Sequence, residues 1–167
     1  MKIAGREIKG PNRVTLVLPR EDYDDIVIIA QAVTDMAEVD KYLEAPKPPA
    51  ITTAEGIEYN WNDQGYVDQL AQYNLKKMAW IVLKSLEPSN IEWATVEIDN
   101  PKTWTNYQKE MRESGFSDVE VNRICNVCME ANALDERKLE AARQSFLRGQ
   151  GAKEKSTSGP STQTPTS

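Results

Sequence analysis

The chain has 167 residues, 40% of them hydrophobic, which suits one buried core with an appendage. Histidine is absent, so the usual general base, the imidazole metal ligand and every Ser-His-Asp or Cys-His arrangement are excluded. The 20 basic and 26 acidic residues give a net charge of -6, which disfavours nucleic-acid binding. The composition therefore favours a protein that binds other proteins over an enzyme, and it indicates no cofactor.

The chain shows no feature of membrane insertion or export. Purely apolar runs such as residues 26–30 are far shorter than the roughly 20 residues that a bilayer-spanning helix needs. Lys2, Arg6 and Glu7 place charges where a signal peptide needs an apolar core. Two cysteines three residues apart cannot staple a domain of this size, which agrees with a reducing compartment. We expect a cytoplasmic protein without a membrane segment.

The first 33 residues are predicted to be rich in β-strand. Residues 2–8 and 13–18 flank a turn-forming segment, residues 9–12, and we expect them to pair as a hairpin. Residues 26–33 are rich in β-branched side chains, which favours a third strand. A helix beginning near Asp22 and running to Leu43 also fits this stretch. We prefer the strand, and so expect a small antiparallel sheet with one face for helices to cover.

The next part, residues 34–86, is predicted to hold two helices separated by a loop. Asp35 and Glu38 form a capping-box pair that starts a short helix ending near Leu43. The proline-rich segment and the polar stretch after it predict a long surface loop over residues 45–60, which also suits a linker between subdomains. Asp63 is expected to cap a helix over residues 64–86, and Pro88 ends it. An apolar stripe runs along this helix through Tyr66, Leu70, Tyr73, Trp80 and Ile81.

Three helix signatures follow a short extended segment, residues 91–98. Asn100-Pro101 is expected to open the first helix and Gly115 to close it. Ser117 and Glu120 form a capping box for the second helix, and a third is expected over residues 135–147. From residue 149 the composition predicts a disordered tail through residue 167. The chain is therefore predicted to be α+β, with one domain over residues 1–148 that is β-rich over 1–33 and helical over 34–148.

Two groups of residues invite a chemical interpretation. Cys125 and Cys128 match Cys-x-x-Cys, but they lie deep inside a predicted helix, and no histidine or second cysteine pair completes a zinc site. Core packing is the better interpretation of both cysteines. The acidic run of residues 21–25 lacks the glycine and the spacing of a calcium loop, so a solvated connector is expected there. We predict no metal site.

Aromatic side chains are the strongest candidates for binding a partner. Trp80 and Trp104 lie on helical stripes and are expected in the core, whereas Trp61 lies in a polar loop and suits an exposed contact. The face formed by Trp104, Tyr107 and Met111 fits either the core or an adaptable protein-binding groove. The candidate partner-binding residues are therefore Trp61, Trp104, Tyr107 and Met111.

The carboxyl-terminal half resembles a known family. The segments that carry the resemblance are residues 84–86, 91–96, 101–104, 110–116, 130–136 and 142–147, with a weaker likeness at residues 19–20 and 46–49. They resemble the tail assembly chaperones of long-tailed bacteriophages. In this family the flexible carboxyl end often continues, through ribosomal frameshifting, into a longer form.

The resemblance implies a non-enzymatic factor of the host cytoplasm with two partners. The factor would bind the tape measure protein, keep it soluble and help tail tube protein subunits to polymerise around it. The resemblance also allows the factor to form a homo-oligomer. A minor tail structural or completion protein that stays in the virion is the principal alternative. A small metal-dependent or thiol enzyme using Cys125 and Cys128, and a host-directed regulator, are further alternatives.

Overall fold

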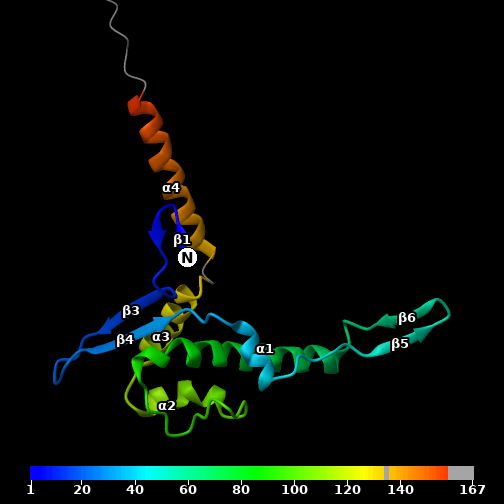
Figure 1. Cartoon of the computed structure of the whole chain (residues 1–167). Helices are drawn as coiled ribbons and strands as arrows, with labels where there is room; N and C mark the ends of the chain where they lie inside the picture. Colours follow the sequence, from blue (N-terminus) through cyan, green and yellow to red (C-terminus); the bar gives the residue numbers. More distant parts are fainter. Residues whose placement is uncertain (134–135, 158–167) are drawn as a thin grey trace, which may run out of the picture. The chain divides into compact units, whose positions relative to one another are not determined.

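The protein has an α+β fold in which the strands precede most of the helices (Figure 1). The computed structural model describes residues 1–133 and 136–157. The chain divides into two compact units, Met1–Asn132 and Ala133–Ser167. The division falls after Asn132, whereas the sequence predicted one domain extending to residue 148. Asn132 caps α3, and Ala133 has a left-handed backbone with φ of 55°, so the helical path ends there.

The strands of the described residues form three separate two-stranded antiparallel sheets. The first joins β1 (Lys2–Ile3) to β2 (Arg6–Glu7), the second joins β3 (Arg13–Leu18) to β4 (Ile26–Gln31), and the third joins β5 (Ala50–Thr53) to β6 (Gly56–Tyr59). The expected strand at residues 26–33 is therefore confirmed over Ile26–Gln31. The expected hairpin between residues 2–8 and 13–18 is wrong.

The amino-terminal segment pairs with itself for a local reason. Ala4 and Gly5 both have positive φ angles, 49° and 79°, and such a pair makes the tight turn that folds β1 back onto β2. β3 is free to pair with β4 over six residues, from Arg13 opposite Gln31 to Leu18 opposite Ile26. This longer pairing also brings the apolar faces of both strands onto the helices, which the short β1 and β2 strands do not do.

The predicted loop over residues 45–60 contains regular structure, which is a second correction. It holds β5 and β6, which meet at a two-residue connection, Ala54 and Glu55, and Gly56 adopts a φ of 136° after it. The short helix before this loop is a 3-10 helix, η1 (Met36–Lys41), and the Asp35 carboxylate accepts from the Ala37 backbone at 3.0 Å. Local turn chemistry thus produces a hairpin inside a proline-rich surface segment.

The long helix α1 (Gln64–Ser85) begins where the sequence predicted. Its Asp63 cap accepts from the Tyr66 backbone N–H at 2.9 Å. A short 3-10 helix, η2 (Glu87–Ser89), follows it. Residues 91–103 form turns and irregular backbone, and η3 (Trp104–Asn106) then leads into α2 (Tyr107–Glu113). The helix expected to open at Asn100 thus starts later. Asn100 lies instead in a turn, in which its carbonyl accepts from Thr103 N–H at 3.0 Å and its side-chain oxygen accepts from Lys102 N–H.

The connection from α2 to α3 (Asp118–Ala131) is closely specified. Phe116 N–H bonds Met111 C=O and Gly115 N–H bonds Arg112 C=O, the two hydrogen bonds of a Schellman motif, with Gly115 at φ of 100°. Ser117 then caps α3, and both hydrogen bonds of its capping box with Glu120 are present. The predicted end of one helix and start of the next are confirmed here.

The core of the first unit lies between the β3–β4 pair, the carboxyl-terminal half of α1, and α2 and α3 (Figure 1). Trp80, Trp104 and Ile124 are fully buried within it. In the second unit, α4 covers Glu136–Thr157 and exposes Leu139, Phe146 and Leu147. α4 extends into the segment for which a disordered tail was predicted, and residues 158–167 of that segment lie outside the described residues.

Candidate protein-binding surface

Three of the four candidate partner-binding residues lie in the core. Trp104 is 0% exposed, Tyr107 6% and Met111 4%. The Trp104 ring meets Tyr42 edge-on, with the ring centroids 6.1 Å apart, and its indole N–H donates to the Ile98 carbonyl at 3.0 Å. The choice between core and groove is therefore decided for these residues, because η3 and α2 turn this face inward. They cannot present a binding surface in this fold.

The cysteine pair belongs to the same interior. Cys128 is fully buried, and burial raises the pKa of its thiol to about 12. Cys125 lies with its sulfur 3.4 Å from the Tyr107 hydroxyl, and burial, followed by this contact, raises the pKa of Tyr107. The Cys128 thiol is therefore neutral near pH 7, which is unfavourable for a nucleophile or a metal ligand. No group of His, Cys, Asp and Glu suited to a metal ion occurs among the described residues.

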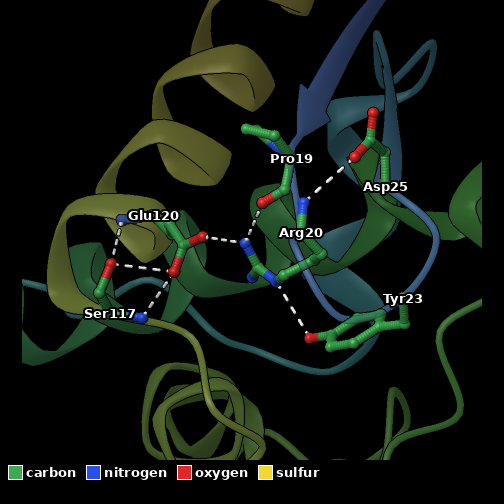
Figure 2. A network of polar contacts seen from close by, with 6 residues as sticks. All are labelled: Pro19, Arg20, Tyr23, Asp25, Ser117 and Glu120. Atoms are coloured by element: carbon green, nitrogen blue, oxygen red, sulfur yellow. Dashed lines mark hydrogen bonds and ion pairs between the residues drawn. The ribbon is translucent and has the colours of Figure 1, made fainter.

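A polar network holds the β3–β4 connection against the start of α3 (Figure 2). The Arg20 guanidinium donates to Glu120 at 2.5 Å, to the Tyr23 hydroxyl at 3.0 Å and to the Pro19 carbonyl at 3.0 Å. The other carboxylate oxygen of Glu120 accepts from the Ser117 backbone and hydroxyl, both at 2.9 Å.

These contacts lower the pKa of Glu120 to about 2, with the Ser117 backbone N–H as the largest cause and Arg20 as the next. Every polar group in the network has a structural partner within it. We therefore assign it a structural role, as a link between two elements distant in the sequence.

An exposed apolar surface of the first unit surrounds the fourth candidate, Trp61. We call residues 50–73 the hairpin surface; it contains β5, β6, Trp61 and the first turns of α1. Ile57 is 69% exposed, Tyr59 56% and Trp61 62%. The rings of Tyr59, Trp61 and Tyr66 follow one another, with centroids 6.3 Å and then 6.0 Å apart. This surface exposes large apolar side chains side by side, which is typical of interaction sites.

Neighbouring elements leave the hairpin surface uncovered. β5 and β6 pack extensively only against each other within the described part of the chain. The amino-terminal half of α1 is exposed or half-buried, and Val67 is 44% exposed, whereas residues 79–83 near its other end are buried. The predicted apolar stripe on α1 is thus covered at Trp80 and Ile81 only, and Tyr66, Leu70 and Tyr73 remain accessible in part.

An open groove borders this surface on α1. It measures about 550 Å³ and lies between residues 43–47 and the face of α1 that carries Asp68, Gln69, Gln72, Tyr73 and Lys76. Its mixed polar and apolar lining suits a peptide chain better than a small apolar ligand. The groove extends the exposed surface from the hairpin along the helix.

The hairpin surface is also acidic. Residues 50–73 contain the carboxylates Glu55, Glu58, Asp63 and Asp68, and they contain neither lysine nor arginine. Asp63 caps α1, and Asp68 accepts from the Gln64 side chain at 2.7 Å. Glu55 and Glu58 form no ion pair in the part of the chain that the structure describes. Two carboxylates therefore stand available to a positively charged partner.

Sequence reasoning selected Trp61 and missed its neighbours on β6. The alternation of Ile57, Glu58 and Tyr59 after Gly56 carries the usual strand signal, and the Ala54-Glu55-Gly56 connection carries the turn signal. The prolines before residue 50 masked this pattern in a segment interpreted as a loop.

Comparison with family models, curated proteins and solved structures finds no match to this chain. Among the described residues, no helix has both the length and the apolar character needed to cross a membrane.

Proposed function

We propose that this chain is a non-enzymatic assembly factor of the phage tail assembly chaperone type, acting in the host cytoplasm. It binds the tape measure protein, keeps that protein soluble and promotes polymerisation of the tail tube protein around it. The single observation that supports this role best is the run of Ile57, Tyr59 and Trp61, whose side chains are each more than half exposed within the described part of the chain.

The proposed role follows from the properties of the tape measure protein, the client. A long helical protein exposes apolar stripes before its partners assemble on it, and these stripes aggregate if they are left in water. A binder must cover them and later leave, so the affinity of each site should be modest and many copies should act together. The hairpin surface fits this requirement because its aromatic side chains bury large areas on contact while its open rim allows release.

Co-expression with the tape measure protein of the same genome tests the proposal. An affinity tag on this chain should recover the tape measure protein, and the soluble fraction of the client should rise when this chain is present. The double substitution Ile57→Ser with Trp61→Ala should reduce the recovered client by about tenfold, the effect expected for removal of an interface hot spot.

Phe146→Ala is the matched control, because Phe146 is 63% exposed, like Trp61 at 62%, and lies on α4 outside the hairpin surface. It should leave client recovery unchanged. A client that neither binds nor gains solubility contradicts the proposal. Mass spectrometry of purified virions separates the two tail hypotheses, because a chaperone should be missing from mature particles and a structural protein should be present in stoichiometric amounts.

A further inference from the structure

Among the residues that the structure describes, β6 pairs with β5 alone and so has a second, unpaired backbone edge. In an antiparallel pair, residues alternate between those that bond their partner strand and those whose N–H and C=O groups point away from it. Asn60 N–H donates to the Pro49 carbonyl at 2.9 Å, so this pair bonds, and by alternation Ile51 with Glu58 and Thr53 with Gly56 bond as well. The backbone groups of Ile57 and Tyr59 therefore point outward.

The outward edge of β5 is formed in the same way by Ala50 and Thr52. Thr52 lies directly opposite Ile57 in the register, so the two residues occupy equivalent positions on the two edges. A lone two-stranded sheet is only marginally stable in water, and an added strand would stabilise it. Both edges thus offer backbone hydrogen bonds to an added strand. Which edge binds a partner therefore depends on the side chains of β5 and β6.

The side chains along β6 alternate in character. Ile57 and Tyr59 point to one face, and Glu58 points to the other. Residues directly opposite each other on neighbouring strands interact through their side chains, favourably for apolar pairs and for opposite charges. β5 offers Ala50, Ile51, Thr52 and Thr53, which carry no charge and bury less area. β6 is therefore the edge with the more specific pattern.

Charge decides what can pair with this edge. The acidic groups of residues 50–73 would face one another if two copies joined edge to edge, and Glu58 would lie close to Glu58 of the second copy. Like charges opposed on neighbouring strands are destabilising. Aromatic faces and free carboxylates both attract lysine and arginine, so the exposed Tyr59 and Trp61 favour the same partner as Glu58.

We propose that the outer edge of β6 binds, as an added strand, an extended segment of a partner protein in which apolar residues alternate with lysine or arginine. Apolar side chains of that segment lie beside Ile57 and Tyr59, and a basic side chain lies opposite Glu58. This inference rests on the proposed function in one respect, since the extended segment would belong to the same client, outside its helical stripes.

A synthetic peptide of about six residues, the usual length of a strand, that alternates valine and lysine tests the proposal without any phage protein. Isothermal titration calorimetry with the full chain should show binding, and a peptide that alternates valine and glutamate should bind at least about tenfold more weakly. Glu58→Lys should reverse this preference, because the charge opposite the added strand is then inverted.

Two proline substitutions identify the edge. Ile57→Pro removes an outward N–H from β6 and should weaken binding of the basic peptide by about tenfold or more, beyond the effect of Ile57→Ala. Thr52→Pro makes the equivalent change on β5, and it should change binding by no more than about twofold. Because Thr52 and Ile57 face each other in the same hairpin, both variants place a proline at an equivalent position.

Several outcomes would overturn the proposal. Equal binding of the two peptides removes the charge argument, and a larger loss with Thr52→Pro than with Ile57→Pro places the added strand on β5. Self-association of the full chain in sedimentation experiments, lost on Ile57→Pro, makes a second copy the occupant. If the basic peptide binds as described while the tape measure protein does not, the edge proposal stands and the proposed client is wrong.

Discussion

The side-chain amide of Asn132 donates a hydrogen bond to the hydroxyl of Ser85 at 2.8 Å, which joins the end of α3 to the end of α1. The same amide nitrogen lies 2.7 Å from the Cys128 carbonyl, and the amide oxygen accepts from Val33 N–H at 2.8 Å. Ser85 is 0% exposed, so its hydroxyl depends on partners inside the protein. One asparagine thus connects three segments that lie far apart in the sequence.

Asn132→Ala should destabilise the protein by about 1–3 kcal/mol, because it leaves polar groups in the interior without their partner. Asn132→Asp tests the same point more narrowly, since a carboxylate still accepts from Val33 but no longer donates to Ser85 or Cys128. Urea unfolding followed by far-ultraviolet circular dichroism measures both. A loss of unfolding free energy well below that range for both variants would mean that water readily takes over the hydrogen bonds of the amide.

Protonation of Glu120 should weaken the fold in acid. Its pKa in the folded protein, about 2, lies below the ordinary value of 4.5, so its contribution is fully present above about pH 4.5 and is lost as the pH falls through about 2. The stability difference between the wild type and Glu120→Gln should therefore shrink between about pH 5 and about pH 2. Urea unfolding across that range measures it.

Glu113→Gln is a suitable control for this experiment. Glu113 pairs with Lys109 at 3.6 Å on the surface, and both side chains are more than half exposed. Exposed pairs of this kind contribute between about 0 and 1 kcal/mol, so this variant should change stability little at any pH. A stability difference for Glu120→Gln that stays constant over the acid range contradicts the expectation.

The two buried tryptophans on the helical stripes should respond differently to phenylalanine. Both are 0% exposed, but the Trp104 indole N–H donates to the Ile98 carbonyl, whereas the Trp80 indole N–H is buried without an acceptor. Trp104→Phe loses a hydrogen bond, and Trp80→Phe removes an unpaired donor. We expect Trp104→Phe to lower the free energy of unfolding by about 1–3 kcal/mol more than Trp80→Phe does. Equal free energies of unfolding for the two variants would contradict this.

The cysteines should react in a defined order with a thiol reagent. Cys128 is fully buried with a pKa of about 12, whereas Cys125 is half-buried. In the native protein near pH 8, Cys125 should therefore be modified first, and Cys128 should react only when the protein unfolds. Mass spectrometry after timed quenching measures the order. Early modification of Cys128 would show that α3 opens locally far more often than its burial implies.

Trp61→Ala should leave the free energy of unfolding within about 0.5 kcal/mol of the wild type, because its side chain is largely exposed. Its effect on client recovery would then report binding and not folding. Urea unfolding of the purified variant measures this directly. A large loss of stability would mean that the contacts among the rings of Tyr59, Trp61 and Tyr66 support the hairpin itself.

Features that depend on a few neighbouring residues were predictable. The capping box of Ser117 and Glu120, the Asp63 cap and the end of α2 at Gly115 follow from hydrogen bonds and backbone angles within one or two helical turns. The strand over Ile26–Gln31 follows from β-branched side chains. Exposure of Trp61 likewise follows from the polar residues around it. In each case the decisive interactions lie close together in the chain.

Features that depend on distant residues were not predictable. The composition of residues 2–8 and 13–18 allows them to pair, and the choice of β4 as the partner of β3 depends on which pairing also covers the helices. The face of Trp104, Tyr107 and Met111 suits a core and a groove equally by pattern. Its burial required η3 and α3 to pack on α1 and α2 to pack on α3. The Asn132 junction likewise required three segments to meet, because burial and pairing are properties of contacts that the chain makes only when it folds.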